Sequence, residues 1–228
     1  MEFVNVLIEE GIANITLQNG KVNAISQQVI EELNSALDQA EEAKAVVVLT
    51  GQTGILSGGY DLKTMQKSMA DAMALVTQGS KLTRRMLAFP TPIITACGGH
   101  AVAKGAFLLL CSDYRIGVNG AFKIGLNEVA IGMVMHHAGI EMARGRMPIN
   151  YFNRSVINAE MFGPEQAVNA GFLDLVVEPE QLMETAKKVA TQFKTLNMRA
   201  HHGTKLKLRK ELLETMDLAI ELDAKGSL

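Results

Sequence analysis

Hydrophobic positions in the first fifty residues alternate between short β-type runs and a longer segment of helical spacing. Phe3 to Ile8 and Ile12 to Leu17 are rich in β-forming residues and are separated by a polar turn at 9–11, which predicts a hairpin. After a capping residue, Ser26, apolar side chains recur at helical intervals; they are Val29, Leu33, Ala36, Leu37 and Ala40. Residues 45–50 are uninterrupted and β-branched, as is typical of a strand covered on both faces.

The order of strand, glycine-rich turn and helix repeats further along the chain. A glycine-rich loop at 51–59 follows the first buried strand, and Gly98-Gly99 follows a predicted strand at 92–97. The remaining patterns predict helices at 69–88, from 105, at 164–170, from 179 to 193 and at 206–222, and strands at 114–118 and 175–177. We therefore predict an α/β fold, with a spiral core over residues 1–178 and a C-terminal helical region over residues 179–228.

Charge and composition narrow the class of protein. The 228 residues carry 22 Lys and Arg against 24 Asp and Glu, a net charge of −2, so no global field attracts nucleic acid. The longest apolar run, Ala106 to Cys111, is far shorter than the ~20 residues that span a bilayer. No secretory signal opens the chain, and its cysteines and histidines show no metal-ligand spacing. We expect a cytoplasmic protein with no nucleic-acid partner, no membrane partner and no metal.

Three stretches of the sequence have a distinctive pattern in a fixed order. They are residues 56–62 (LSGGYDL), 98–107 (GGHAVAKGAF) and 127–133 (NEVAIGM). Together with 111–116 (CSDYRI) and 167–174 (AVNAGFLD), they resemble the enoyl-CoA hydratase/isomerase (crotonase) family over most of the chain. The resemblance implies a crotonase-like spiral of ββα turns. It also implies that the C-terminal helices assemble a homotrimer or homohexamer.

The resemblance implies an acyl-CoA thioester substrate and an oxyanion hole of two backbone N–H groups. It assigns these groups to Gly58 and to Lys104, where the family usually has glycine. A loop amide pairs sensibly with a helix N-terminal amide, because the helix dipole favours negative charge. The Lys104 ammonium is either exposed or directed at a CoA phosphate. Without the resemblance, the two glycine turns only reverse the backbone.

Glu128 is the residue that we expect to move protons. It lies between Leu126 and an apolar run at 129–135, so its carboxylate is expected to face a partly dry pocket that raises its pKa. The family carries a catalytic glutamate at this position. For an arbitrary glutamate, the alternative is a surface acid that caps a turn.

Two departures from the family pattern bear on the reaction. The second catalytic glutamate of a typical hydratase falls at Phe107, and Met135-His136-His137 stands where the family often has Pro-Gly. Hydration usually divides its work between two carboxylates, whereas moving a double bond from the 3 to the 2 position needs one base. We therefore predict a 3,2-enoyl-CoA isomerase, with an enoyl-CoA hydratase or a weakly catalytic acyl-CoA-binding scaffold as alternatives. His136 or His137 either supplies an acid or base or simply packs at a helix start.

Further contacts follow from the same resemblance. Substrate-binding positions are expected at Gly59, Tyr60, Gly105, Phe107, Met133 and His136. No cofactor is expected, because coenzyme A is part of the substrate. Basic residues that could meet its phosphates are Lys21, Lys63, Lys104, Lys205, Lys207, Arg209 and Lys210, the last four alternatively forming a solvated helix face.

For two other groups of residues, a purely structural role is considered beside a functional one. The methionines at 65, 69 and 73 either line an acyl tunnel or pack in the core. Asp61 and Asp113 are expected to be structural, each capping a turn or pairing with a base such as Arg115.

Overall fold

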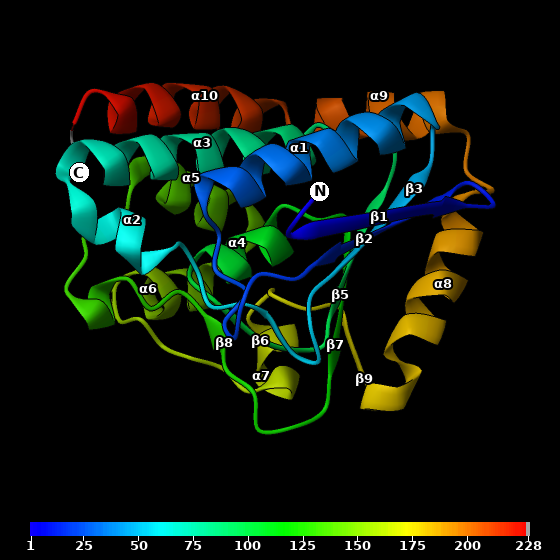
Figure 1. Cartoon of the computed structure of the whole chain (residues 1–228), viewed down its shortest axis with the longest axis horizontal. Coiled ribbons are helices and arrows are strands. Elements are labelled where there is room, and N and C mark those ends of the chain that lie inside the picture. The colour runs from blue at the N-terminus through cyan, green and yellow to red at the C-terminus, as the bar shows by residue number, and fades with distance from the viewer. Residues whose placement is uncertain (227–228) are drawn as a thin grey trace.

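The computed structural model describes residues 1–226 as a mixed α/β fold in which helices cover the sheets (Figure 1). The strands are Val4–Glu9 (β1), Ile12–Leu17 (β2), Val46–Thr50 (β3), Gly54–Ser57 (β4), Ile93–Cys97 (β5), Gly99–Val102 (β6), Tyr114–Val118 (β7), Ile124–Gly125 (β8) and Leu175–Val177 (β9). The helices are Gln27–Glu42 (α1), Leu62–Lys67 (α2), Met69–Leu87 (α3), Lys104–Leu110 (α4), His137–Arg146 (α5), Ile149–Val156 (α6), Pro164–Asn169 (α7), Leu182–Phe193 (α8), Met198–Leu208 (α9) and Lys210–Ala224 (α10). Short 3₁₀ turns lie at Val129–Ile131 (η1) and Pro179–Gln181 (η2).

The strands form two sheets that the chain visits alternately. The larger sheet has the order β1-β2-β3-β5-β7-β9, antiparallel only between β1 and β2, and the smaller one has the order β4-β6-β8. Each of β3, β5 and β7 is followed by a strand of the smaller sheet, so successive turns advance as a spiral. The predicted α/β spiral of ββα turns is confirmed.

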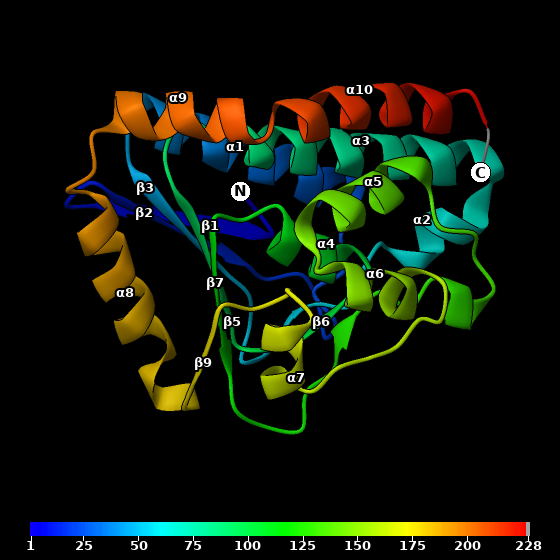
Figure 2. The same ribbon diagram turned by 180° about the vertical axis from the view of Figure 1, so that it is seen from behind.

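Strand β3 is buried on both faces, as its uninterrupted apolar sequence predicts. Val47 and Leu49 belong to the main core with α1 and α3, whereas Val46 and Val48 face a second cluster that α8 covers. Figures 1 and 2 show α8 standing apart from the layer of α1, α3, α9 and α10. Within residues 1–226, no helix combines the length and apolar character needed to cross a bilayer.

Several expected boundaries are wrong. The loop predicted at 51–59 contains β4, and Gly99 begins β6, because these short segments are strands only through pairing with each other and with β8. Helix α2 has no counterpart in the prediction. The helix predicted at 206–222 is two helices that meet at Arg209, whose guanidinium donates to the Leu87 carbonyl at 2.8 Å.

Asp113 is structural, but its partners differ from the expected one. Its carboxylate bonds Lys205 Nζ at 2.7 Å and Arg209 at 2.9 Å, whereas Arg115 pairs with Asp174 at 2.6 Å. Lys205 and Arg209 are therefore buried tethers between the C-terminal helices and the sheet. Neither the phosphate contact nor the solvated face predicted for the basic run applies to these two residues.

Candidate active site

The N-terminus of α4 offers backbone amides without acceptors. Ala103 caps this helix with a φ of 51°, a left-handed conformation that non-glycine residues rarely adopt. Its N–H donates to the Gly125 carbonyl at 3.0 Å, and its carbonyl accepts the amides of Ala106 and Phe107. This strained but pinned turn leaves the Lys104 N–H, at the first helical position, free of any acceptor within the described chain.

The loop between β4 and α2 supplies the facing amide, but not the one predicted. The Gly58 N–H donates to the Val22 carbonyl at 2.8 Å, so the assignment of an oxyanion donor to Gly58 is wrong. The Gly59 N–H is taken by Ser57 Oγ at 3.1 Å. Among these neighbours in the described chain, Tyr60 has an amide without an acceptor.

Gly59 brings the Tyr60 and Lys104 segments together. Its φ is +112°, and a Cβ at this position would lie 3.1 Å from Ala103 Cβ and 3.8 Å from Lys104 N. Any side chain here would therefore be strained and would crowd the start of α4. The substrate-binding role predicted for Gly59 stays a prediction.

Glu128 is a buried acid with an unused oxygen. The residue is 8% exposed, and Oε2 has no hydrogen-bond partner within the described chain. Burial raises its pKa to about 7, against smaller lowering effects from its own backbone amide and from Lys104. The carbonyls of Asn127 and Glu128 accept amides from η1 and Met133, which fix the backbone here. The predicted dry environment and raised pKa are confirmed.

The Lys104 side chain points inward, contrary to both predicted orientations. It is 1% exposed, and its Nζ donates to the Gly79 carbonyl of α3 at 2.5 Å. The ammonium lies 5.5 Å from the centre of the Tyr60 ring. Burial lowers the Lys104 pKa to about 7, although Glu128 opposes this shift.

Gly79 is a site residue that the sequence reasoning missed. A Cβ at Gly79 would lie 2.2 Å from Tyr60 Oη, so the missing side chain is what admits the Tyr60 ring against α3. The available signal was a glycine inside a helical apolar stripe, where it costs about 1 kcal/mol relative to alanine.

Phe107 and His136 fill the space beside α5. Their rings meet edge to face at 5.5 Å, and a Cβ at Gly139 would lie 2.7 Å from His136 and 2.9 Å from Phe107. Burial lowers the His136 pKa to about 3, so its imidazole is neutral near pH 7. The neighbouring His137 begins α5, where its backbone amide donates to Asp223 of α10 at 2.8 Å.

The other predicted contacts are spread around this site. Gly105 packs so tightly that a Cβ would overlap the Ser57 carbonyl, and Met133 is 37% exposed. Met65 packs against the core, whereas Met69 is 69% exposed and lines a surface hollow with Met73. Asp61 caps α2 through Thr64, as expected, and Lys21 and Lys63 are exposed.

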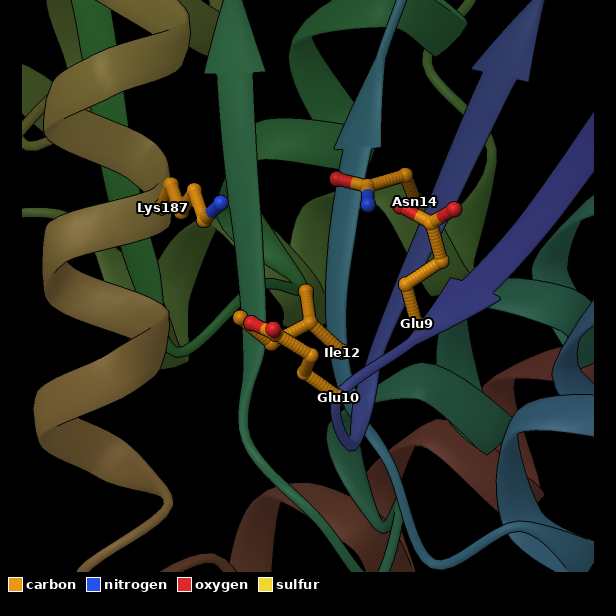
Figure 3. A pocket seen from close by; sticks show the side chains of 5 residues that line it. All are labelled: Glu9, Glu10, Ile12, Asn14 and Lys187. Carbon is orange, nitrogen blue, oxygen red and sulfur yellow. The ribbon is translucent and has the colours of Figure 1, made fainter.

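A separate cavity of about 500 Å³ lies between the β1–β2 hairpin and α8 (Figure 3). Figure 3 shows Lys187 extending from α8 toward the strands. The lining residues are Glu9, Glu10, Ile12, Asn14 and Lys187. None of the predicted site residues lies here, so this cavity is not the candidate active site. Within residues 1–226, no group of three or more His, Cys, Asp or Glu side chains is placed to hold a metal.

The fold and the site together define a spiral α/β protein with paired free amides near a buried acid. A family model described as enoyl-CoA hydratase/isomerase matches residues 7–225. The chain therefore belongs to the enoyl-CoA hydratase/isomerase family, whose members act on acyl-CoA thioesters. The resemblance in the sequence motifs is confirmed.

Relatives and solved structures agree on the family but not on one reaction. An enoyl-CoA hydratase/isomerase family protein from Pseudomonas syringae is 62% identical, with a TM-score of 0.98 over 100% of this chain and 99% of that one. The apo structure of a Mycobacterium tuberculosis enoyl-CoA isomerase is 36% identical, with a TM-score of 0.93 over 98% of each chain. A probable enoyl-CoA hydratase of Bacillus subtilis (strain 168) is 29% identical over 85% of this chain and 76% of its own length.

Proposed function

We propose that the protein is a 3,2-enoyl-CoA isomerase in which Glu128 is the base. The observation that carries this proposal is a buried carboxylate with a free oxygen, in a chain that has the buried Phe107 where the family resemblance puts the second acid of a hydratase. Asp223 also lies near the site, but its two oxygens accept the amides of His137 and Ala138. A single acid with a free oxygen supports proton transfer between two carbons more readily than the addition of water.

The free amides of Tyr60 and Lys104 form the oxyanion hole of this proposal. The thioester oxygen of a 3-enoyl-CoA accepts both N–H groups, which stabilise the negative charge that develops when an α proton leaves. Glu128 takes that proton and returns it to the γ carbon, so the double bond moves into conjugation with the thioester. This transfer is redox-neutral and calls for no cofactor beyond the CoA of the substrate.

Phe107 and His136 exclude water in the proposed reaction. Their rings pack against each other next to α5, and the neutral imidazole presents no charge that would hold a water molecule tightly. Hydration remains the second candidate, because a probable hydratase from Bacillus subtilis is among the relatives and a neutral imidazole can accept a proton.

A substrate panel tests the proposal. Purified protein is incubated with 3-enoyl and 2-enoyl thioesters of several chain lengths, and the products are resolved by mass and chromatography. We expect conversion of 3-enoyl to 2-enoyl thioesters without a gain of water. Predominant formation of 3-hydroxyacyl thioesters would establish the hydratase instead, and binding without turnover would establish the scaffold.

Phe107→Glu tests the reason for this preference. Restoring a second carboxylate should raise hydration above that of the wild-type protein. A folded Phe107→Glu variant with unchanged hydration would contradict the two-carboxylate argument. Phe107→Leu, which keeps the position apolar, serves as the matched control and should show no gain.

A further inference from the structure

Lys104 combines a backbone donor and a buried cation in one residue. Its amide lies at the start of α4 without an acceptor, and its side chain runs into the protein to reach α3. An ammonium carries three donors and is costly to bury unless they find partners. Because this costly burial occurs at the candidate active site, we expect the Lys104 side chain to have a role other than packing.

The ammonium has two oxygen partners on one turn of α3. Nζ donates to the Gly79 carbonyl at 2.5 Å and approaches Thr83 Oγ1 at 3.4 Å. The Thr83 hydroxyl in turn donates to the carbonyls of Gly79 and Ser80, which leaves its lone pairs available to Lys104. The ammonium also contacts the ring of Tyr60, and Tyr60 lies in the loop that carries the other free amide.

We propose that Lys104 is a positioning residue, whose side chain fixes the two amides of the oxyanion hole relative to α3. This inference rests on the proposed function and goes beyond it. An anchor on Gly79 and Thr83 restrains the first turn of α4, and the Tyr60 ring lies beside both the ammonium and Gly79. When protonated, the ammonium also favours the ionised form of Glu128.

The other titratable groups gathered here do not supply that charge. His136 at the start of α5 is neutral because burial lowers its pKa to about 3. Burial and the charges of Glu128 and Asp223 raise the pKa of Tyr60, so its hydroxyl stays protonated. The side-chain oxygens of Asp223 in α10 accept the amides of His137 and Ala138. Among these groups, Lys104 is the one that can carry a positive charge, and because burial lowers its pKa to about 7, it carries this charge chiefly below neutral pH.

Two substitutions separate anchoring from charge. Lys104→Gln keeps a hydrogen-bond donor and removes the charge, whereas Lys104→Met removes both. Isomerase rates are measured from pH 5 to 9, with kcat and KM determined separately. The rising part of the pH–activity curve, called the limb, reports ionisation of Glu128. The pH at its midpoint should be higher by about one unit in both variants. The plateau kcat should fall further in Lys104→Met, by about 10- to 100-fold, with a smaller change in KM.

The position of the limb is read relative to each variant's own maximum, so partial loss of folded protein does not move it. An unmoved limb and an unchanged kcat in both variants, with an active wild-type protein, would overturn the role of Lys104 while leaving the proposed function intact. A wild-type protein that neither exchanges α protons nor isomerises 3-enoyl thioesters would overturn the proposed function, and the role of Lys104 with it.

Discussion

Keeping Glu128 buried without a full set of partners costs folding free energy. Its pKa is raised from an ordinary value of 4.5 to about 7, so the folded protein binds more protons than the unfolded chain between these pH values. The free energy of unfolding contributed by this group is therefore highest below about pH 4.5 and falls as the pH rises through 7. The same burial supplies a base whose pKa lies near neutral pH.

Glu128→Gln should remove this pH-dependent cost. The free energy of unfolding of the variant minus that of the wild-type protein should be roughly 1–3 kcal/mol larger at pH 8 than at pH 5. Urea denaturation at the two pH values measures the difference. If the substitution changed the free energy of unfolding equally at pH 5 and pH 8, the carboxylate would not be buried as the structure has it.

The residue scale also shows where sequence reasoning stops. The dry environment of Glu128 could be predicted, because apolar residues surround it in the sequence. The choice between Gly58 and Tyr60 as the amide donor could not, since it depends on a bond from Gly58 to Val22, thirty-six residues earlier in the chain. The inward path of the Lys104 side chain likewise depends on α3, a distant element.

At the scale of elements, α3 forms one wall of the candidate site through Gly79. Gly79→Ala should gain helix propensity, worth up to about 1 kcal/mol, but its Cβ would overlap the Tyr60 ring. We expect a net loss of about 1–2 kcal/mol of stability and a lower kcat, because the Tyr60 ring and the amide of that residue shift together.

Gly203→Ala provides a matched control for this substitution. Gly203 lies in α9, and a Cβ there would have no neighbour within 4 Å. This variant should be as stable as the wild-type protein or up to about 1 kcal/mol more stable, with unchanged activity. Thermal unfolding and initial rates compare the two. Equal behaviour of Gly79→Ala and Gly203→Ala would contradict the close packing of Tyr60 on α3.

Long elements were predictable because their signals are local. Helix α1 has its Ser26 cap and its apolar stripe, and β3 is a continuous β-branched run. The strands β4 and β6 carry glycines at their ends and are defined by pairing across more than forty residues, so their sequences read as loops and turns. These two strands hold the segments that carry the free amides, which explains why the finer geometry of the site escaped prediction.

At the scale of the whole molecule, buried ion pairs attach the C-terminal helices to the sheet. Asp113 is 10% exposed and sits between Lys205 and Arg209, whose side chains are 4% and 9% exposed. Its carboxylate also accepts the Ile93 amide at 2.8 Å, at the start of β5. Helix α10 contributes Leu213, Met216, Ala219 and Ile220 to the main core. The separate oligomerising role of residues 179–228, the trimeric or hexameric assembly and the cytoplasmic location stay predictions.

Asp113→Asn should leave two buried cations without their counterion and cost about 3–5 kcal/mol of unfolding free energy. The control is Glu160→Gln, which breaks an ion pair with Arg154 whose side chains are 44% and 38% exposed. That change should cost no more than about 1 kcal/mol. Denaturant unfolding of both variants measures the contrast. Similar small losses would show that the C-terminal helices are not held to the sheet through Asp113.

The most direct test of the central claim is α-proton exchange in heavy water. The protein is incubated with a saturated acyl-CoA, which can be deprotonated but not isomerised, and deuterium at the α carbon is followed by mass spectrometry. Wild-type protein should incorporate deuterium, with a rate that rises with pH through about 7, and Glu128→Gln should reduce the rate by about 10²- to 10⁴-fold. Exchange that persists at the wild-type rate in Glu128→Gln, or wild-type protein that binds the thioester without any exchange, would contradict the account.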